Sequence, residues 1–417
     1  MGRRWKAGAA LAAACLLVAT AAAQTPAAAK IGELAGEVAR ITGLKVRKPV
    51  RVETLTRAEW KRYVEEEIER QVKPEEIRAD QLVLQLLGLV PRDFDLKQAT
   101  IDLLAEQAAA VYDHRRKRML LLEGGHGGGA DDAVLVHELA HAVADQHYSM
   151  ERLLDKGAKT GEQQTARLAV VEGQAMWVML EWQFGKSGIG SVSTNRETLE
   201  RMLPALGTMA AASYPVFAKS PLYLQETLLF PYTAGVLFQQ AVIEKIGKRA
   251  FRAVLEKPPA TTHEVLHPEA WLEGRRLEAP PAPVPENEKA YRRLSAGILG
   301  EFDLRVLLKQ YCGEEDALRL APQWRGGSYE LLEHKATGRP ALRWSAAFEE
   351  EAAAQDFAER YRRVLEGKSS GLTWRALGKG RLEGINSDGV FRVEVRGRAV
   401  GVVEGLEPRE GAGRPAI

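Results

Sequence analysis

Apolar residues recur at helical spacing along most of the chain, in segments interrupted by glycine, proline and charge. Residues 31–80 are highly charged with helical spacing, and helices are expected around 82–87 and 96–107, on either side of a glycine and a proline. Two short strands follow at 108–113 and 118–122, because these runs are apolar and β-prone and a polar turn separates them. The first quarter of the chain is therefore expected to be helices followed by a hairpin.

Helical spacing continues through the middle of the chain to about residue 255, including a helix that we expect to open at Phe230 and run to Ile246. Residues 278–286 hold prolines spaced by small residues between two glutamates, which is typical of an extended linker. The linker divides a helical unit, residues 24–277, from a second unit at 287–410.

The pattern of the second unit changes between helical and strand-like runs, which predicts a small antiparallel sheet with a helix. Residues 411–417 are expected to be a disordered tail. The fold class predicted for the whole chain is α+β, predominantly helical. The elements expected in the second unit are helices at 294–310 and 349–365 and strands at 329–333, 342–346, 390–395 and 399–403.

The first 23 residues have the pattern of a secretory signal peptide. Arg3, Arg4 and Lys6 form a basic start, residues 7–22 are apolar, and 21–23 offer an Ala-x-Ala cleavage site. The mature protein is therefore expected to be secreted or periplasmic after cleavage near Ala23. No later run is long and apolar enough to be expected to span a bilayer.

The charge balance and the cysteine content exclude several classes of protein. The signal peptide takes three of the 58 Lys and Arg residues, which leaves 55 against 56 Asp and Glu. A chain so close to neutral is not expected to bind nucleic acid or anionic membranes. Cys312 is the only cysteine outside the signal peptide, so neither an internal disulfide nor a cysteine zinc site is expected. No feature of the sequence indicates an oligomeric state.

His137-Glu138-Leu139-Ala140-His141 is the motif that points to chemistry. Residues i and i+4 of a helix face the same way, so two imidazoles can close on one Zn²⁺. Glu138 can then serve as general base for the attacking water. Asp131 or Asp132 can cap this helix, and its apolar neighbours predict burial nearly all round. Buried polar groups need partners, so a shared metal ion is the interpretation that we favour.

A catalytic zinc takes a third protein ligand, and two residues compete for that place. Glu172 lies on an apolar helical stripe where an unpaired carboxylate would be costly, and the adjacent Gly173 indicates close helix packing. His147 gives the His-x3-His-x5-His spacing of metzincins, but that geometry needs a chain turn at Ala144. An ion pair with arginine is the alternative role for Glu172. The remaining candidates, ranked lower, are Glu162 and Glu181.

Other residues around the motif have alternative roles. Asp145 follows His141 by four residues, so it can orient a ligand histidine or form a salt bridge with Lys or Arg. The glycine-rich loop 124–129 lacks the Lys-Ser/Thr of a phosphate cradle, and its His126 is expected to be solvated. The hairpin before the motif can pair with a substrate backbone by strand addition.

Several segments resemble a group of bacterial secreted proteins with a zincin-like metallopeptidase pattern. The specific parts are His-Glu-x-x-His at 137–141 and Glu-Gly-x-Ala at 172–175, and the resemblance spans most of residues 80–365. The weaker resembling segments are Val111–Asp113, Phe230–Tyr232 with Gly235, Thr262–Pro268, Trp324–Tyr329 and Leu342–Trp344.

The resemblance implies a gluzincin-type zinc metallopeptidase domain, with short antiparallel strands before the motif helix and one Zn²⁺. It implies His137, His141 and Glu172 as metal ligands and Glu138 as base, with a peptide or protein as substrate. Tyr232 and His267 lie in resembling segments and become candidates to stabilise the oxyanion. The alternative is a non-catalytic metal-binding or interaction protein of the cell envelope that retains the zincin site.

Overall fold

The computed structural model describes residues 28–107, 109–123, 131–275, 277, 280–285, 287–378 and 380–408. The expected signal peptide, the loop with His126 and the C-terminal tail lie outside these residues. Within the described ranges, no helix combines the length and the apolar character needed to cross a bilayer. The chain is a mixture of helices and sheets in which helices predominate, which confirms the expected α+β class.

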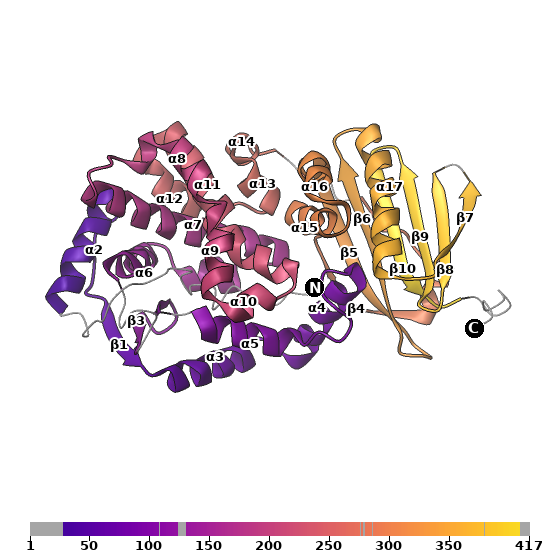
Figure 1. The fold of residues 1–417 in the computed structure, drawn as a ribbon, viewed down its shortest axis with the longest axis horizontal. Helices are drawn as coiled ribbons and strands as arrows, with labels where there is room; N and C mark the ends of the chain where they lie inside the picture. Colours follow the sequence, from indigo (N-terminus) through magenta and orange to yellow (C-terminus); the bar gives the residue numbers. More distant parts are fainter. Residues whose placement is uncertain are drawn as a thin grey trace.

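The N-terminal part of the molecule is mainly helical and lies beside a C-terminal part built on a sheet (Figure 1). A π-helical turn at Glu151–Lys156 connects the helix Asp132–Asp145 to the helix Gly161–Lys186. The helices of this part are α2 (Ala28–Thr42), α3 (Arg57–Gln71), α4 (Pro74–Leu87), α5 (Leu96–Gln107), α6 (Asp132–Asp145), α7 (Gly161–Lys186), α8 (Arg196–Met202), α9 (Ala205–Ser213), α10 (Pro215–Lys219), α11 (Leu222–Ile246), α12 (Ala250–Glu256), α13 (Thr262–Leu266) and α14 (Pro268–Glu273).

A small sheet precedes α6 and contains the two predicted strands, β2 (Ala110–Asp113) and β3 (Arg118–Leu122), paired antiparallel. The prediction of helical structure throughout 31–80 is wrong at β1 (Arg51–Leu55), which pairs parallel with β3. This strand is mostly exposed, so its sequence carries little apolar alternation, and pairing with β3 rather than local preference stabilises it. The strand order is β1-β3-β2, which leaves β2 at an edge.

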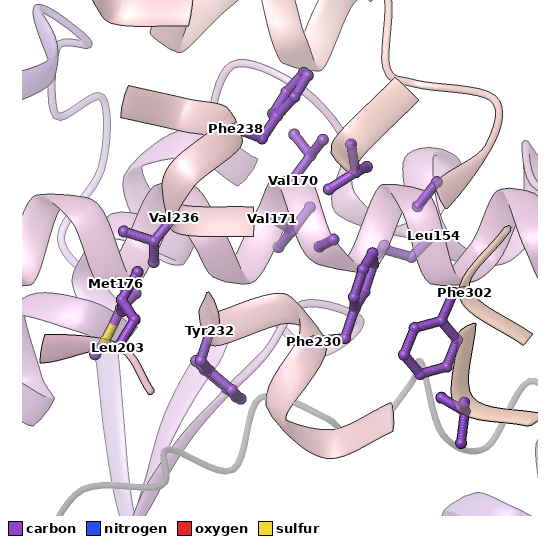
Figure 2. Packing of buried hydrophobic residues seen from close by; sticks show 14 of the residues in the cluster. Leu154, Val170, Val171, Met176, Leu203, Phe230, Tyr232, Val236, Phe238 and Phe302 are labelled. Carbon is purple, nitrogen blue, oxygen red and sulfur yellow. The ribbon is translucent and has the colours of Figure 1, made fainter. Parts of the chain in front are cut away.

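Helices α7 and α11 cross at two glycines. A Cβ on Gly173 would lie 2.2 Å from the backbone of Gly235, and one on Gly235 would lie 2.1 Å from the carbonyl oxygen of Ala169. The contact confirms that Gly173 has a packing role. Helix α11 starts at Leu222 and contains Pro231, so the prediction of a helix opening at Phe230 is wrong. Figure 2 shows Phe230 and Tyr232 of α11 within the buried cluster that also contains Val170 and Val171 of α7.

The C-terminal part holds an antiparallel sheet of seven strands among the described residues, in the order β4-β5-β6-β10-β9-β8-β7. Helix α17 packs on this sheet, which confirms the expected antiparallel sheet with a helix (Figure 1). The elements are β4 (Tyr291–Gly297), α15 (Glu301–Cys312), α16 (Glu314–Leu320), β5 (Trp324–His334), β6 (Pro340–Phe348), α17 (Glu351–Lys368), β7 (Thr373–Gly378), β8 (Arg381–Asn386), β9 (Gly389–Arg396) and β10 (Ala399–Leu406).

The prediction of one helix over 294–310 is wrong, because β4 occupies Tyr291–Gly297 and α15 begins only at Glu301. Strand β4 is an edge strand with three consecutive exposed residues, so the alternation that would reveal it is missing. Strands β7 and β8 were not predicted either, and β7, at the opposite edge of the sheet, is also largely exposed.

Candidate metal centre

Helix α6 carries the His-Glu-x-x-His motif through the interior of the N-terminal part. Asp131 caps the helix, because its side chain accepts a hydrogen bond from Ala133 N at 3.2 Å. Every residue from Ala133 to Asp145 is buried, as the apolar sequence around the motif predicts. The helix therefore presents His137 and His141, one turn apart, to the neighbouring helix α7.

Glu172 of α7 meets the two histidines, and the three side chains form a compact triad. The Nε2 atoms of His137 and His141 are 3.1 Å apart, and Glu172 Oε2 lies 3.2 Å from the first and 3.4 Å from the second. Two ligands of a tetrahedral zinc, each about 2.1 Å from the ion, lie roughly 3.4 Å apart. The donor set and its spacing therefore fit a Zn²⁺ ion.

Burial and mutual charge set the protonation of the triad. Burial lowers the pKa of His137. Burial also acts to lower the pKa of His141, but the Glu172 carboxylate outweighs it and raises that pKa. Although burial opposes ionisation of Glu172, His141 and His137 lower its pKa to about 2. The ionised carboxylate of Glu172 suits a metal site, because metal ligands must be deprotonated. A divalent cation would compensate its negative charge.

The environment of the histidines adds one unusual feature. Nδ1 of His137 is buried and has no hydrogen-bond partner among the described residues. Metal-bound histidines usually donate their second ring N–H to an acceptor, which fixes the ring. On its Nδ1 side the His137 ring is therefore held by packing, and the ring of Tyr232, with its centroid 6.2 Å away, is part of that packing.

Glu138 is fully buried, and the edge strand β2 holds its carboxylate. Tyr112 N donates to Glu138 Oε2 at 2.6 Å. Tyr112 faces Met119 across the β2–β3 pair at a position where its N–H points away from β3. The edge N–H that could have bound a substrate backbone at this position therefore binds the candidate base instead.

The two candidates for oxyanion stabilisation lie in different places. Tyr232 is buried beside His137, next to the triad. His267 contacts Glu301 in another cluster, with its Nε2 3.1 Å from both carboxylate oxygens. The structure thus brings Tyr232 to the triad and places His267 with different partners.

The competing residues for the third ligand are engaged elsewhere. His147 lies past the end of α6 with its Nε2 2.7 Å from the carbonyl oxygen of Lys45. Glu162 accepts hydrogen bonds from Thr262, and Glu181 accepts them from Ser191 and Val192. Glu172 is the residue that the fold brings to His137 and His141.

Asp145 forms the salt bridge that was one of its two expected roles. Its carboxylate binds Lys117 Nζ at 2.6 Å and accepts hydrogen bonds from the hydroxyl of Tyr112 and the main chain of Met150. No hydrogen bond between Asp145 and His141 is present among the described contacts. Asp145 therefore anchors the end of α6 to the hairpin.

A second cluster of potential ligands was not predicted from the sequence. His263 and His267 lie with Glu301, and their ligand atoms fall within 4.8 Å of one another. The sequence does hold an indication of it, because residues 263–267 read His-Glu-Val-Leu-His, a second His-Glu-x-x-His. The sequence did not indicate the contact between Tyr112 N and Glu138, because any residue except proline can supply a main-chain N–H.

Comparisons with known proteins reach only the C-terminal part. A family described as a domain of unknown function (DUF8575) matches residues 289–413. No curated protein matches the chain, and no solved structure matches it. The triad of His137, His141 and Glu172 lies outside the matched segment.

Proposed function

We propose that this protein is a zinc-dependent metallopeptidase whose centre is formed by His137, His141 and Glu172. The observation that carries the proposal is the convergence of these three buried side chains, at zinc-like spacing, with Glu138 adjacent on the same helix. The His₂Glu ligand set is one of the sets that catalytic zinc sites use.

Each residue of the site has a separate role in the proposed peptide hydrolysis. A bound zinc would polarise the scissile carbonyl and acidify the attacking water. Glu138 takes the proton of that water and delivers it to the leaving amine. The N–H of Tyr112 holds the carboxylate in one orientation for both transfers. Tyr232, beside His137, is the candidate donor to the oxyanion.

We propose that this activity lies outside the cytoplasm, because the amino-terminal pattern of the sequence is that of a signal peptide cleaved near Ala23. The substrate is then a peptide or protein of the periplasm or the surroundings. Nothing in the near-neutral charge of the chain favours a polyanionic partner.

The test compares the purified wild type with Glu138→Gln. The variant should bind zinc in the same amount, because Glu138 is not a ligand and glutamine can still accept the Tyr112 hydrogen bond. Cleavage of an unstructured protein substrate should fall at least about a hundredfold, since a general base contributes roughly 10²–10⁴. Equal cleavage by the variant and the wild type would exclude Glu138 as the base.

One observation favours a second candidate, a zinc site without catalysis. His137 and Glu138 are both 0% exposed, whereas a catalytic zinc keeps an open position for water and substrate. In this alternative the zinc stabilises the packing of α6 on α7 in a cell-envelope protein. Zinc bound in full amount, with no cleavage of any unstructured substrate by the wild type, would support it.

A further inference from the structure

We infer that His263, His267 and Glu301 form a second divalent-cation site, suited to Zn²⁺, which joins the helical part of the molecule to the C-terminal part. The inference does not depend on peptidase activity. It rests on a cluster of two imidazoles and one carboxylate contributed by elements on either side of the linker.

The ligand atoms of Glu301, His263 and His267 lie close together around one point. Glu301 Oε2 lies 2.5 Å from His263 Nδ1, and both oxygens of Glu301 lie 3.1 Å from His267 Nε2. A single N–H bond has a preferred direction and usually selects one oxygen. The equal distances from His267 fit a carboxylate that faces a shared centre, and zinc would replace the short His263–Glu301 hydrogen bond.

Burial makes the cluster costly without a bound cation. His263 is 4% exposed and Glu301 is 2% exposed, while the side chain of His267 is 26% exposed. The carboxylate and the first imidazole are thus nearly out of water, where a charge needs compensation. The partial exposure of His267 leaves an approach for an ion and for a water ligand.

Hydrogen bonds fix the elements that carry the ligands. Glu162, at the start of α7, accepts from the N–H and the hydroxyl of Thr262, which begins α13. The same hydroxyl accepts from Phe302 N in the first turn of α15. The starts of these three helices are therefore linked at the point where His263 and Glu301 meet, so the ligands are pre-positioned.

The second centre is separate from the first. Glu162 and Glu172 are ten residues apart on α7, a rise of about 15 Å. Thr262 contacts Glu162, whereas His137 contacts Glu172. An ion held by α13 and α15 therefore cannot share ligands with the triad on α6 and α7.

The second motif lacks the arrangement of a peptidase. Glu264, its central glutamate, accepts hydrogen bonds from the main chain of Ala260 and Thr261 as part of a capping box. The helix α13 has only five residues and ends just before His267. Since Glu264 is committed to the cap, the second site is structural: it ties α13 of the helical part to α15 of the C-terminal part.

The test is the zinc content of the full-length mature chain after equilibration with zinc and removal of excess. We expect two ions per wild-type chain and one in His263→Ala, in Glu301→Gln and in His141→Ala. The double variant His141→Ala/His263→Ala should bind none. His334→Ala is the matched control, because His334 is a partly exposed histidine of β5 that bonds Thr337 and belongs to neither cluster, and it should keep both ions.

A second measurement guards against loss of folding in the variants. In the His141→Ala background, zinc should still raise the midpoint of thermal unfolding, and this shift should vanish when Glu301→Gln is added. One ion per wild-type chain that persists in both His263→Ala and Glu301→Gln would overturn the inference and leave a hydrogen-bonded His-Glu-His cluster. Because the readout is ion count, the result is independent of whether the chain cleaves peptides.

Discussion

At the residue scale, the placement of one carboxylate decides what the motif helix can do. Glu172 lies on a buried face of α7, with its side chain 2% exposed and both imidazoles of α6 within 3.4 Å. The apolar stripe around it indicated this position, because burial of a lone carboxylate predicts a partner. The stripe could not identify that partner, since contact with α6 is a tertiary event.

Glu172→Gln should abolish tight zinc binding, because the variant replaces the only anionic ligand of the triad with a neutral amide. We expect zinc affinity to fall at least about a hundredfold, measured by competition with a chromophoric chelator in the His263→Ala background, so that a single centre is observed. Glu181→Gln is the matched control, since Glu181 is on the same helix and bonds Ser191 and Val192. If both variants bind zinc equally, Glu172 is not a ligand.

The turn that carries Asp113 gives the protein a predictable response to acid. Asp113 is buried and accepts hydrogen bonds from the main chain of Arg115 and Arg116. Burial alone would raise its pKa, but the main-chain N–H of Arg116, the Arg116 guanidinium and the Tyr63 hydroxyl together lower that pKa below its usual value. The folded state therefore holds the ionised form more strongly than the unfolded state does, and Asp113 stabilises the fold above its unfolded pKa.

Asp113→Asn should lower the free energy of unfolding by about 1–3 kcal/mol at pH 6. The difference from the wild type should shrink as the pH falls from about 4 through the lowered folded pKa, because the wild-type carboxylate is then protonated too. Urea unfolding at pH 6, 5, 4 and 3 measures this difference. Asp93→Asn is an exposed control with the same change of charge, and a constant difference for Asp113→Asn at every pH would contradict the assignment.

At the element scale, the crossing of α7 over α11 sets where Glu172 lies. The two helices touch through the backbones of Gly173 and Gly235, so no side chain separates them. Gly173 is next to Glu172, and any widening of the crossing moves the carboxylate relative to His137 and His141. Close helix packing and the proposed metal centre therefore depend on the same contact.

Gly173→Ala should destabilise the protein by about 1–3 kcal/mol or more, because its Cβ would enter the backbone of Gly235 and force the helices apart. Zinc affinity should fall as well. Gly185→Ala is the control on the same helix, where a Cβ meets nothing within 4 Å. That change should instead stabilise the fold by about 0.5–1 kcal/mol, since alanine is the better helix former. Opposite signs in thermal unfolding would support the close crossing, and equal effects would refute it.

The elements that the sequence predicted and those that it did not differ in where their stability comes from. Helix α6 has a capping aspartate and a continuous apolar surface, which are local features. Strands β1, β4 and β7 each have a run of exposed residues or alternate between exposed and partly buried ones. Each lies at the edge of a sheet and pairs with a single neighbouring strand. Their existence depends on pairing, which an apolar pattern does not report.

The same distinction explains the two clusters of histidines. His137 and His141 are four residues apart on a buried helix, so the pattern of the sequence predicts that they share a site. His263 and His267 have the same spacing, but their carboxylate partner, Glu301, lies on the far side of the linker. The spacing of a motif indicates which ligands can share a face, and only the tertiary fold supplies the remaining partner.

At the scale of the whole molecule, the C-terminal part completes the end of a helix in the N-terminal part. The last carbonyl groups of a helix have no partner within it. At the end of α4, Lys368 Nζ donates to the carbonyl oxygen of Leu86 at 2.6 Å, and the hydroxyl of Tyr311 donates to that of Gly88 at 2.7 Å. Lys368 also pairs with Glu404 at 2.6 Å, with both side chains nearly inaccessible to water.

This junction predicts that the two parts stabilise each other through Lys368. Lys368→Met removes the cation from a carboxylate whose side chain is 1% exposed, and it also removes the donor to Leu86. Loss of one partner of a buried ion pair costs about 3–5 kcal/mol, so the free energy of unfolding in urea should fall by that amount. Glu404 would keep its hydrogen bonds from Trp344 and Tyr361, which do not neutralise it.

Two comparisons separate the buried charge from general damage. Lys368→Met/Glu404→Gln should recover part of the lost stability, because glutamine still accepts the remaining hydrogen bonds and carries no charge. Arg196→Met breaks surface ion pairs with Glu200 and Glu244, whose side chains are a third to a half exposed, and it should cost less than about 1 kcal/mol. A double variant no more stable than Lys368→Met would show that packing, rather than the uncompensated Glu404, accounts for the loss.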